Sequence, residues 1–194
     1  MSTAKLTRSA LIAALYAAVT LLALLFLGGL AWGPVQFRVS EALCVLGLFC
    51  PEAIPGLTIG CVLANLLNSI INGILVSGWM DVVFGSLATL LGSIWMWKLR
   101  RHRAVALLGP VLANALIVSA YLPLILAGLG YYTIPFTNID LSGSYALMYL
   151  FGAVATGIGE AVVLYALGLP LAAAIGRLHL FSEDTTQRPS ISQK

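Results

Sequence analysis

The polar residues best suited to chemistry lie together in one short segment, from Trp32 to Leu43. The preceding run, from Ser9 to Phe37, contains no charged side chain. An amide, a guanidinium, a hydroxyl and a carboxylate then follow within a few positions, as Gln36, Arg38, Ser40 and Glu41. Burying such groups costs several kcal/mol unless each finds a partner. We therefore expect the segment to face water at a membrane surface or to line a polar cavity, and we interpret it as one wall of a small-molecule site.

A purely structural interpretation of the same segment is also open. Ser40 could be the N-cap of the helix that follows, and Arg38 and Glu41 could form an interfacial salt bridge there. The long side chain of Arg38 would then extend to the lipid headgroups. The residues alone do not choose between a binding site and such a cap.

Composition identifies the chain as an integral membrane protein. Of its 194 residues, 60% are hydrophobic and 9% are charged, with a mean hydropathy of +1.01, whereas a soluble domain is about 25% charged. The net charge of +3 gives no reason to expect nucleic acid as a partner. Three cysteines without CxxC spacing predict neither a disulfide framework nor a zinc site. We expect no metal and no cofactor.

The hydropathy pattern predicts an all-α protein, with six transmembrane helices in a single domain over residues 1–181. Two prolines and a glycine in the segment Cys50–Gly56 predict a turn after a short second span. The polar tail, 182–194, is expected to be disordered. The predicted spans cover about residues 8–29, 39–50, 53–71, 79–97, 105–127 and 145–175.

The basic residues predict how these spans are oriented. All of the ten lysines and arginines except Arg38 lie near the N-terminus, in the loop 98–103 or in the segment 177–194. Six spans place both termini on one side, and the positive-inside rule makes that side the cytoplasm. The Arg38 segment, the loop 72–80 and the loop 128–144 then share the outer face. We predict a multi-pass protein of the cell membrane with an outward-facing pocket.

Other side chains are predicted to converge on the same pocket. Asn68 shares a helical face with Asn65 and Asn72, although such amides also serve to hold helices together. Glu160 lies near the middle of the last span, where an ionisable side chain is a candidate functional residue. The outer loops and the start of the fourth span add an acid and aromatic rings, namely Trp79, Asp81, Tyr131 and Tyr132.

The first span carries a ladder of small residues at helical spacing, Ala10, Ala14 and Ala18. Small residues four positions apart allow another helix to approach closely in lipid. The ladder either packs inside this protein or docks a helix of a partner, and the pattern alone fits both.

Motifs for enzymatic chemistry do not occur in the sequence. It contains no GxxxxGK[ST] phosphate loop, no HExxH and no GxSxG. We therefore expect that the protein is not an enzyme and that any uptake draws on an outside energy source. A small membrane enzyme, a channel or a stand-alone carrier is the alternative, although a channel would have no need of an aromatic-lined outer site.

Taken together, these features resemble the substrate-binding S components of energy-coupling-factor (ECF) vitamin transporters. The resemblance rests on the six short spans, the small size and the alanine ladder, and it covers about residues 5–178. The run from Gly33 to Leu43 is similar to the signature of the queuosine-precursor transporter (QueT) branch. In that family the ladder docks a shared transmembrane scaffold subunit, which two ATPases drive.

The same resemblance implies a ligand, a 7-deazaguanine precursor of queuosine such as the aminomethyl form preQ1. A guanine-like edge presents N–H donors that Glu41 could accept, and its carbonyl oxygen could accept from Arg38 or Gln36. A flat ring requires aromatic faces, which Trp79, Tyr131 and Tyr132 offer. The aminomethyl cation requires an acid, and the candidates are Asp81, Asp140 and Glu160. Another vitamin or a purine on the same scaffold remains the alternative substrate.

Overall fold

The structure of the chain, a computed structural model, describes residues 2–28, 37–128 and 144–178, and the structural statements below concern these residues. Every regular element in this part of the chain is helical. Five helices are long and apolar enough to cross a membrane, and one shorter apolar helix completes the bundle. The prediction of an all-α membrane bundle of six helices is confirmed. The tail 182–194 lies outside the described residues, so the domain boundary stays a prediction.

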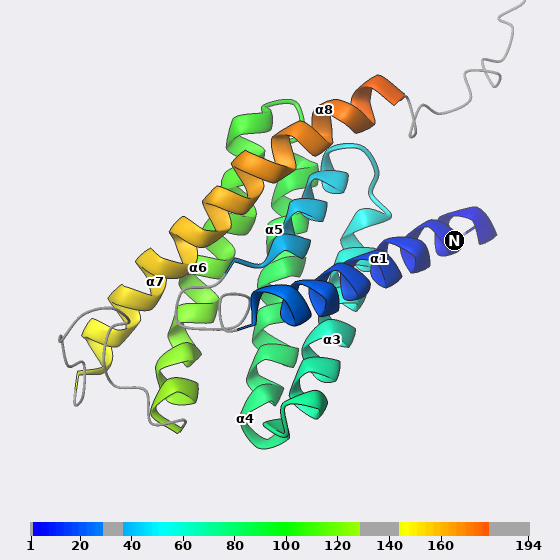
Figure 1. Cartoon of the computed structure of the whole chain (residues 1–194). Helices are drawn as coiled ribbons and strands as arrows, with labels where there is room; N and C mark the ends of the chain where they lie inside the picture. The colour runs from blue at the N-terminus through cyan, green and yellow to red at the C-terminus, as the bar shows by residue number, and fades with distance from the viewer. Residues whose placement is uncertain (1, 29–36, 129–143, 179–194) are drawn as a thin grey trace, which may run out of the picture.

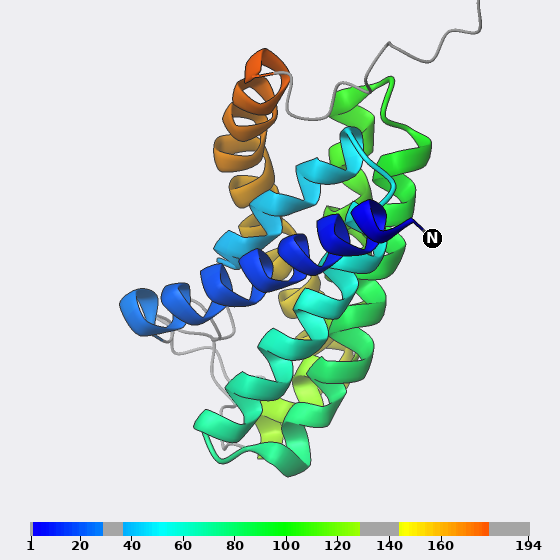
Figure 2. The ribbon, with the colours of Figure 1, turned by 90° about the vertical axis from the view of Figure 1, so that its right-hand side faces the viewer.

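The first helix, α1 (Thr3–Leu27), crosses α3 (Ala53–Ile71) in close contact (Figure 2). A Cβ added to Gly60 would lie 2.8 Å from the Ala13 carbonyl oxygen and 2.8 Å from the Tyr16 Cβ. A Cβ on Gly56 would likewise lie 2.9 Å from the side chain of Ile12. Glycine at these positions lets the two backbones approach, as small residues do between helices in lipid.

The short second segment forms the centre of the bundle. It is a 3₁₀ helix, η1 (Val39–Leu48), rather than an α-helix, and every residue from Ser40 to Leu48 is buried. A 3₁₀ helix rises about 2.0 Å per residue instead of 1.5 Å, so a short segment reaches farther through the core. The turn after η1 is short, because α3 begins at Ala53, as the predicted span 53–71 requires. Pro55 lies in the first turn of α3, where its missing N–H removes no helical hydrogen bond.

The fourth transmembrane segment is one continuous rod, in which a π turn joins two α-helices. It runs through α4 (Leu75–Met80), a π turn η2 (Asp81–Gly85) and α5 (Ser86–Lys98). Helix α5 packs tightly on the next helix, because a Cβ on Gly92 would lie 2.8 Å from the Pro110 Cα. Single π turns inside α-helices frequently mark functional sites.

The last two segments pack along one another. Helix α6 (Arg103–Gly128) contacts α7 (Tyr145–Val162), which continues through a second π turn, η3 (Val163–Gly168), into α8 (Leu169–Leu178). The continuous stretch from Tyr145 to Leu178 has 34 residues. At 1.5 Å per residue it is roughly 50 Å long, and the hydrocarbon core is only about 30 Å thick, so the helix must tilt or protrude. Figure 1 shows it crossing the bundle diagonally.

The described helices define two opposite ends of the bundle (Figure 1). Helix α4 lies at the same end as the C-terminus of α6 and the N-terminus of α7. The turn between α5 and α6, with its basic residues, lies at the other end together with α8. A polar core lies between these two ends.

Candidate functional site

A buried carboxylate marks the point where η1 meets α1 and α5. Glu41 is fully buried, and its Oε1 accepts hydrogen bonds from the hydroxyls of Tyr16 and Thr89, the latter at 3.3 Å. Its Oε2 accepts from the thiol of Cys44 at 2.9 Å. An ionised carboxylate has about four acceptor positions. Three donors from three different elements therefore hold this group in place.

A second polar chain begins at Arg38, the residue that precedes η1. Arg38 is buried, and its Nη2 donates to the Oδ1 of Asn65 on α3 at 2.7 Å. The amide nitrogen of Asn65 donates in turn to the backbone carbonyl of Asp81 at 2.6 Å, where the π turn η2 begins. The hydroxyl of Tyr121 on α6 donates to the Asp81 carboxylate at 2.7 Å. The chain thus joins four transmembrane segments through hydrogen bonds.

Small residues make room for this second chain and connect it to the first. A Cβ on Gly85 would lie 3.1 Å from the Asn65 Nδ2 and 3.3 Å from the Tyr121 hydroxyl. The sulfur of Cys61 lies 3.4 Å from the Asn65 amide nitrogen and 3.4 Å from the Thr89 hydroxyl. Because Thr89 also contacts Glu41, the two chains form one continuous polar core.

The capping interpretation of the Arg38 segment does not fit this geometry. Arg38 is only 6% exposed and bonds inside the bundle, so its side chain does not reach the headgroups. Ser40 is fully buried and accepts a hydrogen bond from the Thr20 hydroxyl at 2.7 Å. Arg38 occupies the N-cap position of η1, and its side chain makes no capping hydrogen bond there. The polar residues of this segment therefore belong to the interior.

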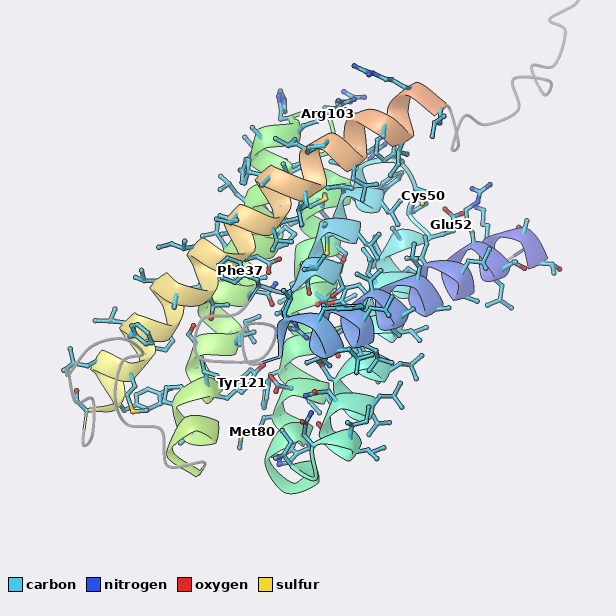
Figure 3. All side chains as sticks on the ribbon, in the orientation of Figure 1. Phe37, Cys50, Glu52, Met80, Arg103 and Tyr121 are labelled. Carbon is cyan, nitrogen blue, oxygen red and sulfur yellow. The ribbon has the colours of Figure 1, made fainter. Side chains whose placement is uncertain are left out.

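The other predicted site residues are distributed more widely. Asn68 is fully buried and its Oδ1 accepts from the Asn72 amide at 2.7 Å. The ring of Trp79 is 48% exposed and contacts Phe84, which in turn contacts the ring of Tyr121. Figure 3 shows Tyr121 and Met80 below Phe37, in the half of the bundle that contains α4. Gln36, Asp140, Tyr131 and Tyr132 lie outside the described residues.

Glu160 lies on α7, which packs against α6, and within the described residues no hydrogen bond links it to either of these chains. It is 3% exposed, and no hydrogen bond to its Oε1 occurs in the part of the chain that the structure describes. Asn114, Ser119 and Thr156 are the other buried polar residues of these two helices with atoms that lack partners among the described residues. The structure thus separates Glu160 from the other two candidate acids, because Asp81 accepts a hydrogen bond and Asp140 is not described.

The alanine ladder lies on the outside of the bundle. Ala10, Ala14 and Ala18 are all exposed, whereas their neighbours Ala13 and Ala17 are buried. The contact between α1 and α3 uses the buried face. The ladder is therefore not used for packing within the described chain, and docking of a partner helix stays a prediction.

Sequence reasoning missed four donors of the polar core, namely Tyr16, Cys44, Thr89 and Tyr121. One signal was available for the tyrosines, because a phenol in the middle of an apolar span must find a hydrogen-bond partner when it is buried. Cysteine and threonine carry no such signal, since both also occur as ordinary packing residues in membrane helices.

A bundle of helices long and apolar enough to cross a membrane, with a buried, charged core, defines a multi-pass membrane protein. The comparison with protein families is more specific. The family model for the QueT transporter matches residues 6–177, and the chain therefore belongs to the QueT transporter family. The membership identifies it as a membrane transporter and confirms the family predicted from the run Gly33–Leu43.

A curated relative agrees with this family. The chain is 38% identical over 81 residues to the queuosine precursor transporter QueT of Lactococcus lactis subsp. cremoris (strain MG1363). The matched segment covers 42% of this chain and 42% of the relative. No solved structure matches the chain significantly.

Asn65 is the link whose removal tests the polar core. Asn65→Leu takes a partner from both the Arg38 guanidinium and the Asp81 carbonyl, so we expect a loss of about 2–3 kcal/mol in the free energy of unfolding. Asn72→Leu is the matched control, because Asn72 is exposed and, within the described residues, its side chain bonds only to Asn68. Denaturant unfolding of both variants in micelles measures the difference. Equal losses would mean that Asn65 adds nothing beyond an ordinary helix contact.

Proposed function

We propose that this protein is the substrate-binding membrane subunit of an ECF-type importer, and that it captures a 7-deazaguanine precursor of queuosine at the outer face. Membership of the QueT transporter family supports a transporter of this kind. The name of the Lactococcus relative, a queuosine precursor transporter, supports the substrate class. The observation that carries the proposal is the buried pair of Arg38 and Glu41 inside a membrane bundle. Charged groups at such depth are rare and typically functional.

The chemistry of a guanine-like edge complements this pair. In our proposal Glu41 accepts N–H groups of the ligand, and Arg38 or Gln36 donates to its carbonyl oxygen. Two of the present partners of Glu41 are weak, because a thiol is a poor donor and the Thr89 contact is long at 3.3 Å. Ligand N–H groups can replace both partners while the Tyr16 bond persists. Further contacts are proposed for Asn68, Trp79, Asp81, Tyr131, Tyr132 and Glu160.

The exposed ladder on α1 supports the second half of the proposal. Ala10, Ala14 and Ala18 present small side chains to the outside of the bundle, where a helix of the ECF scaffold subunit could approach closely. Because the sequence has no phosphate loop, we propose that two ATPase subunits supply the energy through that scaffold. Both termini then lie in the cytoplasm, as the basic residues predict.

A thermal-shift panel on the purified protein tests the substrate class. We expect 7-deazaguanines to raise the melting temperature, because a ligand at a hundredfold excess over its Kd adds roughly 2.7 kcal/mol to stability. Guanine and the B vitamins should have little effect at the same concentration. Stabilisation by a B vitamin and by no 7-deazaguanine would assign the protein to another substrate.

Glu41→Gln tests the proposed contact with the guanine edge. The amide replaces one acceptor oxygen with a donor, so we expect a loss of at least about thirtyfold in affinity. This value is the low end of the cost of removing one partner of a buried charged pair. The penalty should shrink for an analogue without the exocyclic amine. Glu52→Gln is the matched control, since Glu52 is also buried but lies beside α1, away from Tyr121 (Figure 3). Binding by Glu41→Gln within about threefold of wild type would make Glu41 a structural residue.

Ala14→Trp tests docking of the scaffold. The indole would hold a partner helix away from α1, so uptake in cells that contain the scaffold and ATPases should be abolished while ligand binding stays near normal. Leu116→Trp provides the control, because Leu116 is 56% exposed on α6, a helix that does not carry the ladder. If binding and uptake fall together in Ala14→Trp, the ladder serves the fold of this subunit instead.

A further inference from the structure

The seam between α6 and α7 brings two backbones close together in the interior. A Cβ on Gly152 would lie 3.3 Å from the Ser119 hydroxyl oxygen, and a Cβ on Gly157 would lie 3.3 Å from the Ala115 Cβ. The helices therefore meet with little side-chain volume between them. Any polar group on the facing sides is removed from lipid and from bulk water alike.

Four polar side chains occupy these facing sides, and each is at least nine-tenths buried. The exposed fractions are 1% for Asn114, 0% for Ser119, 4% for Thr156 and 3% for Glu160. Several of their polar atoms have no hydrogen-bond partner within the described residues. These atoms are the nitrogen and oxygen of the Asn114 amide, the hydroxyl oxygens of Ser119 and Thr156, and the Oε1 of Glu160. Each such group costs about 1–3 kcal/mol when buried unpaired, and a charged group costs more. Native proteins rarely bury such groups together unless a ligand, an ion or water completes them.

Glu160, Asn114 and Thr156 each have an oxygen that can accept a hydrogen bond. Thr156 lies one helical turn before Glu160 on α7, so both side chains lie on the same face. The Asn114 amide is within reach of the Glu160 carboxyl, but no hydrogen bond between them meets ordinary limits of distance and angle. A carboxylate oxygen, an amide oxygen and a hydroxyl oxygen can together accept three N–H groups.

The surrounding charges favour a cation at this place. Glu160 lies near two side chains of opposite charge, Glu41 and Arg38, so an ionised Glu160 adds a negative charge that this pair does not balance. Two carboxylates in a low-dielectric interior repel one another unless a positive group lies between or beside them. A primary ammonium group carries the required charge and three N–H donors.

We propose that Glu160, Asn114 and Thr156 form a subsite for a primary ammonium group, and that this subsite selects the aminomethyl form of a 7-deazaguanine over neutral forms. The inference rests on the proposed function and extends it to the part of the ligand that distinguishes the precursors from one another. It also assigns the amine to one acid of the three that the sequence leaves open. Asp81 already accepts from Tyr121 through its carboxylate and from Asn65 through its carbonyl.

The test compares two ligands on two variants of the whole protein. Isothermal titration measures the affinity of aminomethyl-7-deazaguanine and of cyano-7-deazaguanine, which lacks the cation. Glu160→Gln should lose at least about thirtyfold in affinity for the aminomethyl form, as for one partner of a buried charged pair, and change by less than threefold for the cyano form. Glu52→Gln, a buried carboxylate outside the core, should bind both ligands like the wild type.

Stability without ligand separates this role from a structural one. Thr156→Val keeps the shape of the side chain and removes a hydroxyl without a partner, so the melting temperature of the free protein should stay level or rise. Its affinity for the aminomethyl form should fall about tenfold, the effect of one hydrogen bond to a charged group. Lower melting temperatures together with equal losses for both ligands would overturn the subsite and make these residues part of the helix contact.

The remaining outcomes distinguish failure of the subsite from failure of the proposed function. If the wild type binds both ligands and Glu160→Gln weakens them equally, the subsite is wrong and the substrate class stands. If the wild type binds neither ligand, the proposed function fails and the subsite fails with it. If sodium ions stabilise the ligand-free wild type but not Glu160→Gln, the occupant is an inorganic cation, and the ammonium assignment is overturned.

Discussion

The structure depends on one constraint, that the charged side chains buried at its centre need partners within the protein. Glu41 meets it through donors on α1, η1 and α5, and Arg38 meets it through α3. Because no water is at hand in the hydrocarbon core, these bonds are decisive for which helices become neighbours. The arrangement of the bundle follows from satisfying two charged side chains that are only three residues apart.

Departures from the regular α-helix serve the same requirement. The 3₁₀ helix η1 places Glu41 and Cys44 one above the other, because three residues complete one turn, so the thiol can donate to the carboxylate. The π turn η2 begins at Asp81, whose carbonyl accepts from Asn65. In a regular α-helix that carbonyl would accept only from the backbone N–H four residues further along the helix. Both irregular elements thus border the polar core.

The amino-acid sequence predicts the large features of this protein and leaves the fine ones open. Apolar length predicts the bundle of six helices, and the run Gly33–Leu43 predicts the family. Hydropathy measures how readily a segment transfers from water to lipid. It does not indicate whether the ten residues of η1 form a 3₁₀ helix or an α-helix. The partners of Glu41 are likewise hidden, because Tyr16, Cys44 and Thr89 meet it only after three separate elements have packed. The lack of partners around Glu160 is a property of the α6–α7 seam, which no single helix reveals.

The close contact of α1 with α3 has a consequence for the outer surface of the bundle. With backbones this close at Gly56 and Gly60, α1 cannot turn about its own axis without a clash. The same helix holds the Tyr16 hydroxyl against Glu41 on its inner side and exposes Ala14 and Ala18 on its outer side. A rotation large enough to turn the alanines away would pull the phenol from the carboxylate. The angular register of the lipid-facing surface is therefore set by a hydrogen bond in the protein interior.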